Sequence, residues 1–226
     1  MDIRLNYVEK GSGAPLVLLH GNGESTACFS AQIPYFSKKY RVIAVDTRGH
    51  GESPRGTAPF TLSQFADDLK GLFDELGLRD VNLLGFSDGG NIAITFTLRY
   101  PGYVKKLILN GANMTPEGVV PEVTEMFARE YAEAKDALAR GEGDMRKLEL
   151  LELMINEPHF TRKMLSKIDV PTLVLAGDED MILPSETDAI ADSINGSVKC
   201  ILKGSHFIVS ENSEEYNKAV DRFLEA

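Results

Sequence analysis

The sequence has no tryptophan, only two cysteines, and no uncharged apolar run long enough to span a membrane. Cys28 and Cys200 share no metal-ligand spacing with each other or with the four histidines, so neither a disulfide framework nor a zinc site is expected. The N-terminal residues 1–6 contain no apolar core of a signal peptide. We therefore expect a soluble, cytoplasmic protein that uses no metal and no cofactor.

Basic residues are also scarce, since 24 Lys and Arg stand against 34 Asp and Glu and give a formal net charge of −10. An acidic surface repels nucleic acid and anionic membranes, so neither is expected as a partner. A solvated acidic surface that maintains solubility is the favoured explanation of this charge. A preference for neutral or cationic substrates is the alternative and stays open.

A chain of 226 residues suits a single domain that buries a sizeable core without disulfides or metals. Apolar runs of strand length alternate with helical patterns, which is typical of a mostly parallel sheet with helices on both faces. The expected strands are 3–9, 15–19, 41–45, 81–84, 106–110, 172–176 and 199–202. A helix is expected over 61–76, with Thr61 and Gln64 as a capping box and Gly77 as its stop, and another over 213–224.

Ser87 lies at the centre of a G-x-S-x-G pattern, Gly85 to Gly89, between the apolar run 81–84 and the helical pattern 89–100. A serine at a sharp turn between strand and helix has strained backbone angles, and glycines on either side let the two elements approach closely. Its hydroxyl is then presented to a substrate. Because serine is a poor nucleophile at its free pKa, it needs a neighbouring base to take its proton.

Two later strand ends carry the groups that such a serine needs. Three acids, Asp178, Glu179 and Asp180, follow the strand expected at 172–176, and His206 follows the strand expected at 199–202. Serine, then acid, then histidine is the chain order of a hydrolase triad on an α/β sheet. We predict His206 as the general base and one of the three acids as the group that fixes its tautomer.

Together these segments resemble the α/β-hydrolase fold family over nearly the whole chain. Leu18 to Gly23 is similar to the family's oxyanion loop, and Asp46 to Ser53 is similar to its D-x-R-G-x-G-x-S segment. The resemblance implies an α/β fold with a mostly parallel twisted sheet, helices on both faces, and a serine hydrolase of the esterase type.

The resemblance also implies roles for individual residues. In the family the acid stands three residues after a strand-ending glycine, which leads from Gly177 to Asp180, with Asp178 as the alternative. The oxyanion hole is implied to consist of the main-chain N–H groups of Asn22 and Asp88. The alternative for Asn22 is a turn residue tolerant of positive φ.

Substrate binding is assigned to Glu24 and Phe86. The Asp88 carboxylate could pair with a substrate amine, but an N-cap role for it is favoured. The remaining histidines are weaker candidates. We expect His20 to hold the oxyanion loop by hydrogen bonds, His50 to be structural, and His159 to lie in or just after the cap described next.

The segment from about 114 to 167 breaks the alternation because it is wholly helical. In the related family a helical cap is inserted at this point, so helices over 121–140 and 144–156 are expected to cover the site. The expected organisation is one domain, residues 1–226, with this cap insertion. A cap would shield the reaction from water and shape the substrate pocket. An ordinary pair of crossover helices is the alternative.

The leading hypothesis is a serine hydrolase that cleaves a small carboxylic ester through an acyl-enzyme, with a small ester-like molecule as its partner. The same triad serves enzymes that act on amide, thioester, lactone or carbon–carbon bonds, and perhydrolases. A weakly catalytic ligand sensor or signalling protein is the alternative of a different class. A homodimer is left open.

Overall fold

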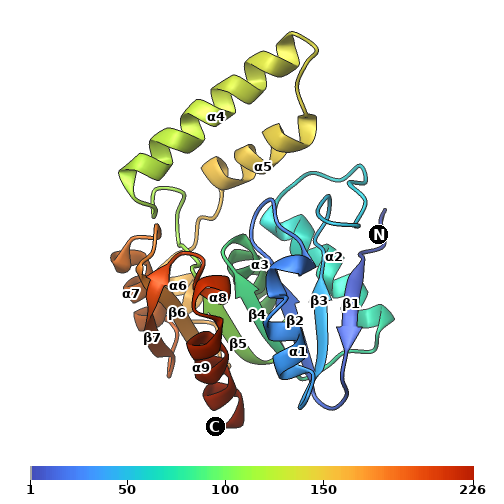
Figure 1. Cartoon of the computed structure of the whole chain (residues 1–226), viewed down its shortest axis with the longest axis vertical. Helices are drawn as coiled ribbons and strands as arrows, with labels where there is room; N and C mark the ends of the chain where they lie inside the picture. Colours follow the sequence, from blue (N-terminus) through green and yellow to red (C-terminus); the bar gives the residue numbers. More distant parts are fainter. Residues whose placement is uncertain (1) are drawn as a thin grey trace.

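The computed structural model describes residues 2–226, and a seven-stranded sheet forms its centre (Figure 1). The strands are β1 (Tyr7–Lys10), β2 (Pro15–Leu19), β3 (Arg41–Val45), β4 (Val81–Phe86), β5 (Val104–Asn110), β6 (Thr172–Glu179) and β7 (Val198–Ser205). Their order across the sheet is β1-β3-β2-β4-β5-β6-β7. Only the pairing of β1 with β3 is antiparallel among these strands, so the predicted α/β fold with a mostly parallel sheet is confirmed.

The first strand is shorter than predicted, because it begins at Tyr7 and not at Ile3. Its partner β3 ends at Val45, directly opposite Tyr7, so the residues before Tyr7 have no strand to pair with. Ile3 and Leu5 are nevertheless buried, in the hydrophobic cluster on the α2 side of the sheet. The alternation of apolar residues therefore correctly predicted that Ile3 and Leu5 are buried, but wrongly predicted that they belong to a strand.

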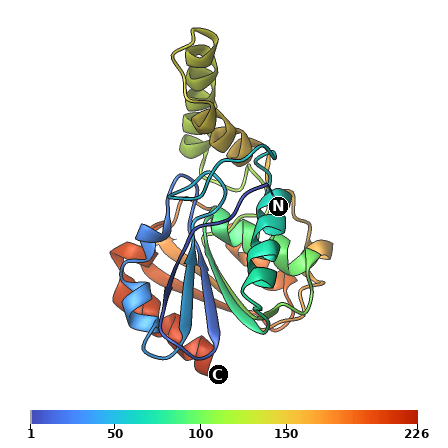
Figure 2. The same ribbon diagram turned by 90° about the vertical axis from the view of Figure 1, so that its right-hand side faces the viewer.

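Helices cover both faces of the sheet (Figure 2). They are the short 3₁₀ helix Thr26–Phe29, α1 (Gln32–Phe36), α2 (Leu62–Glu75), α3 (Asp88–Arg99), α4 (Pro121–Ala139), α5 (Met145–Asn156), α6 (Arg162–Leu165), α7 (Pro184–Ser193), α8 (Ile208–Glu211) and α9 (Ser213–Glu225). One cluster joins α2, α3, α6 and α7 to one face of the sheet, and the other joins α1, α8 and α9 to the opposite face. No helix within residues 2–226 is both long and apolar enough to cross a membrane.

The alternation of side chains along β2 shows how the sheet supplies both clusters. Val17 and Leu19 point into the α2 side, whereas Leu16 and Leu18 point into the α9 side, and all four are fully buried. A strand buried on both faces reads as a continuous apolar run, which is why the central strands were easy to predict.

The N-terminus of α2 matches the predicted capping box only in part. The Thr61 hydroxyl accepts a hydrogen bond from the main-chain N–H of Gln64, as expected of an N-cap residue. The Gln64 side chain donates to Asp68 instead of reaching back to Thr61. Gly77 takes a φ of 64° just past the helix and ends it as predicted.

Helices α4 and α5 lie where the sequence predicts two helices, and they project beyond one end of the sheet (Figures 1 and 2). At the base of this hairpin the Phe160 N–H donates to the Met114 carbonyl at 2.8 Å, and both side chains are buried in the α2-side cluster. The outer parts of the segment 114–167 thus pack with the body. What projects is the hairpin of α4 and α5.

Candidate active site

Ser87 stands at the turn between β4 and α3 with φ 55° and ψ −123°, a left-handed conformation unusual for a residue with a side chain. A Cβ atom placed on Gly85 would lie 2.1 Å from the carbonyl oxygen of Gly89, so only glycine allows strand and helix to meet so closely here. The strained serine and its flanking glycines are as the G-x-S-x-G pattern predicts.

The structure brings Ser87, His206 and Asp180 into one chain of hydrogen bonds. His206 Nε2 lies 2.9 Å from Ser87 Oγ, and His206 Nδ1 lies 2.7 Å from Asp180 Oδ1. The side chains of Asp180 and His206 are each only 3% exposed. A carboxylate at Nδ1 holds the proton on that nitrogen, which leaves Nε2 free to accept the proton of the serine hydroxyl.

Asp180 is held by the loop that follows β6. Its Oδ1 atom also accepts a hydrogen bond from the Ile182 N–H at 2.9 Å. The alternative acid, Asp178, is exposed and accepts from the Gly204 N–H instead. His159 is exposed beyond α5. The geometry therefore separates Asp180 from the other candidate acids, which the sequence alone left in competition.

The loop from His20 to Glu24 is fixed by side chains around it. The Gly21 N–H donates to Glu24 Oε2, and the Gly23 N–H donates to His50 Nε2, both at 3.1 Å. His20 Nδ1 lies 2.7 Å from the Gly21 carbonyl oxygen, so His20 holds this loop as expected. The Glu24 carboxylate stabilises this loop through that hydrogen bond, and its predicted role in substrate binding stays a prediction.

Burial keeps both loop histidines neutral. It lowers the pKa of His20, and it lowers the pKa of His50 to about 4. His20 Nε2 accepts from the Thr47 N–H at 3.1 Å, just as His50 Nε2 accepts from Gly23. An unprotonated Nε2 is needed at both rings, since a proton on that nitrogen would remove the acceptor.

The main-chain N–H groups of Asn22 and Asp88 are available for an oxyanion. Within residues 2–226 no acceptor is hydrogen-bonded to either group. Asp88 is the first residue of α3, where the helix dipole favours negative charge. The predicted pair of donors thus has the availability that an oxyanion hole requires.

The Asp88 carboxylate does not cap α3, contrary to the favoured prediction. It accepts hydrogen bonds from the side-chain amides of Asn22 at 2.8 Å and Asn91 at 3.3 Å. Burial raises the pKa of Asp88 despite these two donors. Asn91 donates in turn to Asn113 Oδ1 at 2.9 Å, and the Asn22 amide also donates to the Leu150 carbonyl of α5 at 3.3 Å.

Sequence reasoning missed Asn91 and Asn113, although signals for both existed. Asn91 lies three residues after Asp88 on α3, a spacing that places the two side chains on one face of a helix. Asn113 follows the carboxyl end of β5, where parallel sheets gather their functional groups. The spacing from Asp88 would have identified Asn91, and the position after a strand end would have identified Asn113.

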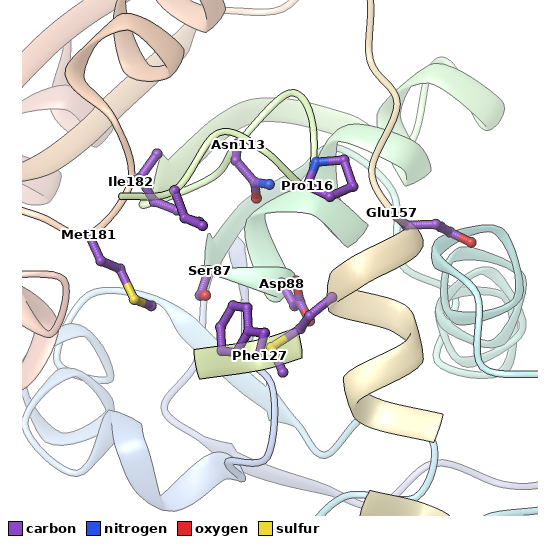
Figure 3. A pocket seen from close by; sticks show the side chains of 10 residues that line it. Ser87, Asp88, Asn113, Pro116, Phe127, Glu157, Met181 and Ile182 are labelled. Atoms are coloured by element: carbon purple, nitrogen blue, oxygen red, sulfur yellow. The ribbon is translucent and has the colours of Figure 1, made fainter. Parts of the chain in front are cut away.

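A cavity of about 40 Å³ lies against Ser87 beneath the α4–α5 hairpin (Figure 3). The residues that line it are Ser87, Asp88, Asn113, Pro116, Val119, Phe127, Met154, Glu157, Met181 and Ile182. Figure 3 shows Glu157 directed away from Ser87, and its carboxylate accepts from the Leu62 N–H at the start of α2. Burial raises the pKa of Glu157.

Phe86 was also predicted to bind substrate, which stays a prediction. It is buried on the α9 side of the sheet, with its ring centroid 5.0 Å from that of His206. Neither Phe86 nor Glu24 is among the described residues that line the cavity at Ser87. As the last residue of β4, Phe86 continues the alternation of Leu84 and so faces the core.

Comparison with known proteins agrees with this fold. Residues 14–157 match the family model described as the alpha/beta hydrolase fold. Over 99% of its length the chain is 27% identical to the serine hydrolase BPHL of Mus musculus, covering 84% of that protein. Over 97% of its length it is 29% identical to the (E)-2-((N-methylformamido)methylene)succinate hydrolase of Acinetobacter baylyi, covering 94% of that protein.

Among solved structures, the chain is similar to a thermophilic esterase from Thermogutta terrifontis. The TM-score is 0.81 and the identity 27%, with 99% of this chain and 93% of that chain covered. The family model spans well over half of the chain and includes the serine turn. This protein therefore belongs to the α/β-hydrolase fold family.

Proposed function

We propose that the protein is a serine hydrolase that cleaves small carboxylic esters through an acyl-enzyme. The observation that carries the proposal is the hydrogen-bonded chain from Ser87 Oγ through His206 to Asp180, at 2.9 and 2.7 Å. These distances are short enough for direct proton transfer between the serine and the imidazole.

In the proposed reaction, His206 Nε2 takes the Ser87 proton while Ser87 Oγ attacks the ester carbonyl carbon. Asp180 stabilises the imidazolium that forms, without itself taking the proton. The imidazolium then gives its proton to the departing alkoxide, which leaves as the alcohol. Water, deprotonated by His206, attacks the acyl-enzyme and releases the carboxylic acid and Ser87.

The negative charge on the carbonyl oxygen would be stabilised by the main-chain N–H groups of Asn22 and Asp88. Loss of one such donor typically costs about 3 kcal/mol of transition-state stabilisation. The hydrogen bonds of Gly21 and Gly23 support this assignment, because they hold the loop on either side of Asn22.

The space beside the nucleophile, about 40 Å³, holds the reacting group and little of the chains on either side of it. Amide, thioester, lactone and carbon–carbon hydrolysis and perhydrolysis use the same triad and are the alternatives within this fold. The name of the Acinetobacter baylyi relative describes a hydrolase whose substrate is a substituted succinate, not a simple ester.

Intact-mass labelling with a fluorophosphonate, followed by turnover of short-chain p-nitrophenyl esters, tests the proposal. We expect one label per chain in the wild type and none in Ser87→Ala, with kcat lower by about 10,000-fold or more in the variant. Failure of the folded wild type to take the label would contradict an activated serine. Labelling with a single slow turnover, together with a large rise in Tm on ligand binding, would favour a sensor.

A further inference from the structure

The space at Ser87 is too small for a whole substrate. A cavity of about 40 Å³ is small beside the roughly 150 Å³ of a cavity that holds benzene. The groups on both sides of an ester carbonyl must therefore extend beyond it. Each of these groups needs space elsewhere in the protein.

A second cavity, of about 250 Å³, lies on the α4–α5 hairpin, is lined by both helices, and opens to solvent beside the exposed residues Thr124 and Ala128. Three residues, Pro116, Phe127 and Met154, line it together with the cavity at Ser87. A cavity of about 150 Å³ lined by apolar side chains is enough to hold a molecule as large as benzene. The second cavity thus has the volume that the first lacks.

The two cavities are separated by these three shared side chains. Figure 3 shows the Phe127 ring beside Ser87 and Pro116 on the loop behind it. Methionine has three rotatable bonds and adapts to irregular space, so Met154 is suited to a movable wall. Phe127 and Met154 are only half-buried, so neither belongs to the fully buried core.

The position of His206 indicates which half of the ester lies on this side. His206 must give its proton to the leaving alcohol, so the alcohol has to lie beside its imidazole. His206 is not among the described residues that line the cavity at Ser87. The acyl half is therefore the one that faces Phe127, Met154 and the larger cavity.

We propose that the cavity between α4 and α5 is the binding site for an unbranched apolar acyl chain, which enters when Phe127 and Met154 turn aside. The proposal rests on the proposed function and names its substrate class, esters whose acyl group is longer than the space at Ser87. Apart from Glu117, the residues that line the cavity carry no charge, as a hydrocarbon chain requires.

The test compares kcat/KM for p-nitrophenyl octanoate and p-nitrophenyl acetate in four proteins. They are the wild type, Phe127→Ala, which removes the wall, Ala128→Trp, which fills the larger cavity, and Ala139→Trp, a matched change at the exposed end of α4. Each methylene buried in an apolar site contributes a factor of about four to binding. If Ala128→Trp prevents two or three methylene groups of the octanoyl chain from being buried, the loss of binding has the size of the effect expected here.

We expect the octanoate-to-acetate ratio to fall at least about tenfold in Ala128→Trp and to stay at the wild-type value in Ala139→Trp. In Phe127→Ala the ratio should rise by a similar factor. Lengthening the alcohol instead, from ethyl to octyl acetate, should give the same ratio in the wild type and Ala128→Trp. A change confined to the alcohol series would overturn the assignment to the acyl chain.

Fluorophosphonate labelling of the same samples separates the two proposals. Full labelling with an octanoate-to-acetate ratio that neither Phe127→Ala nor Ala128→Trp changes would overturn the acyl site and leave the serine hydrolase standing. Absence of labelling in the wild type would overturn the hydrolase, and the acyl site with it.

Discussion

The proposed catalytic centre and the α4–α5 hairpin are held in place by different interactions. Ser87, Asp180 and His206 each follow directly on a strand, and hydrogen bonds join the three side chains. The two helices of the hairpin pack largely against each other. Their contacts with the body include the hydrogen bond from the Asn22 amide to the Leu150 carbonyl and the ion pair of Arg55 with Glu149. The proposed chemistry thus depends on residues at the ends of strands of the sheet, whereas the proposed space for substrate depends on the position of two helices.

The most direct way to disrupt the proposed centre without changing Ser87, Asp180 or His206 is Gly111→Ala. A Cβ atom at this position would lie 2.7 Å from His206 Cε1 and 2.9 Å from Nδ1, and the φ of 62° disfavours any side chain. His206 must shift, and a displacement of about 1 Å can cost a factor of about 100 in rate. We expect kcat/KM for p-nitrophenyl acetate to fall by about that factor or more.

Gly77→Ala is the matched control for this change. Gly77 has nearly the same φ, 64°, but nothing lies within 4 Å of the added methyl group. Gly77→Ala should therefore lower Tm through a similar backbone strain, and it should leave kcat/KM at the wild-type value. If both variants lost activity equally, backbone strain and not contact with His206 would be the cause.

The loop beside the centre should be sensitive to acid through His50. Its pKa in the folded protein is about 4, below the ordinary value of 6.5, so only the unfolded chain takes up this proton between those values. The stability contributed by the neutral ring is complete above pH 6.5 and is lost as the pH falls toward 4. At about 1.4 kcal/mol per unit, the loss approaches 3 kcal/mol.

His50→Gln tests this, because glutamine offers an acceptor to the Gly23 N–H but does not titrate. The free energy of unfolding, measured by urea denaturation from pH 7.5 to 4.5, should fall less steeply in the variant than in the wild type. Parallel curves would mean that His50 does not carry the acid sensitivity. The pKa of His20 is also lowered by burial, so some of the acid sensitivity should remain in the variant.

The same contrast between centre and hairpin explains what the sequence could predict. The serine turn, the acid three residues after Gly177 and the histidine after β7 are local signals, each fixed by a few neighbouring residues, and the structure brings all three together. The substrate-binding role given to Phe86 was harder to judge from the sequence, because its environment includes His206, which lies far along the chain. Helical periodicity placed α4 and α5 but could not show that Phe127 and Met154 face Ser87.

The smallest effect is expected where the hairpin meets the body, at Arg55. Its guanidinium donates to the Glu149 carboxylate of α5 at 2.7 Å and lies 4.3 Å above the Phe60 ring. The Arg55 and Glu149 side chains are 32% and 20% exposed, so solvent screens the pair and its contribution is about 1 kcal/mol or less. Arg55→Gln should raise KM for p-nitrophenyl octanoate about two- to fivefold and leave the rate of fluorophosphonate labelling unchanged. Arg99→Gln, which removes a comparable pair with Asp67 on the body, should change neither quantity. A slower labelling rate in Arg55→Gln alone would show that the hairpin also orders the catalytic centre, and the separation drawn between the two regions would be wrong.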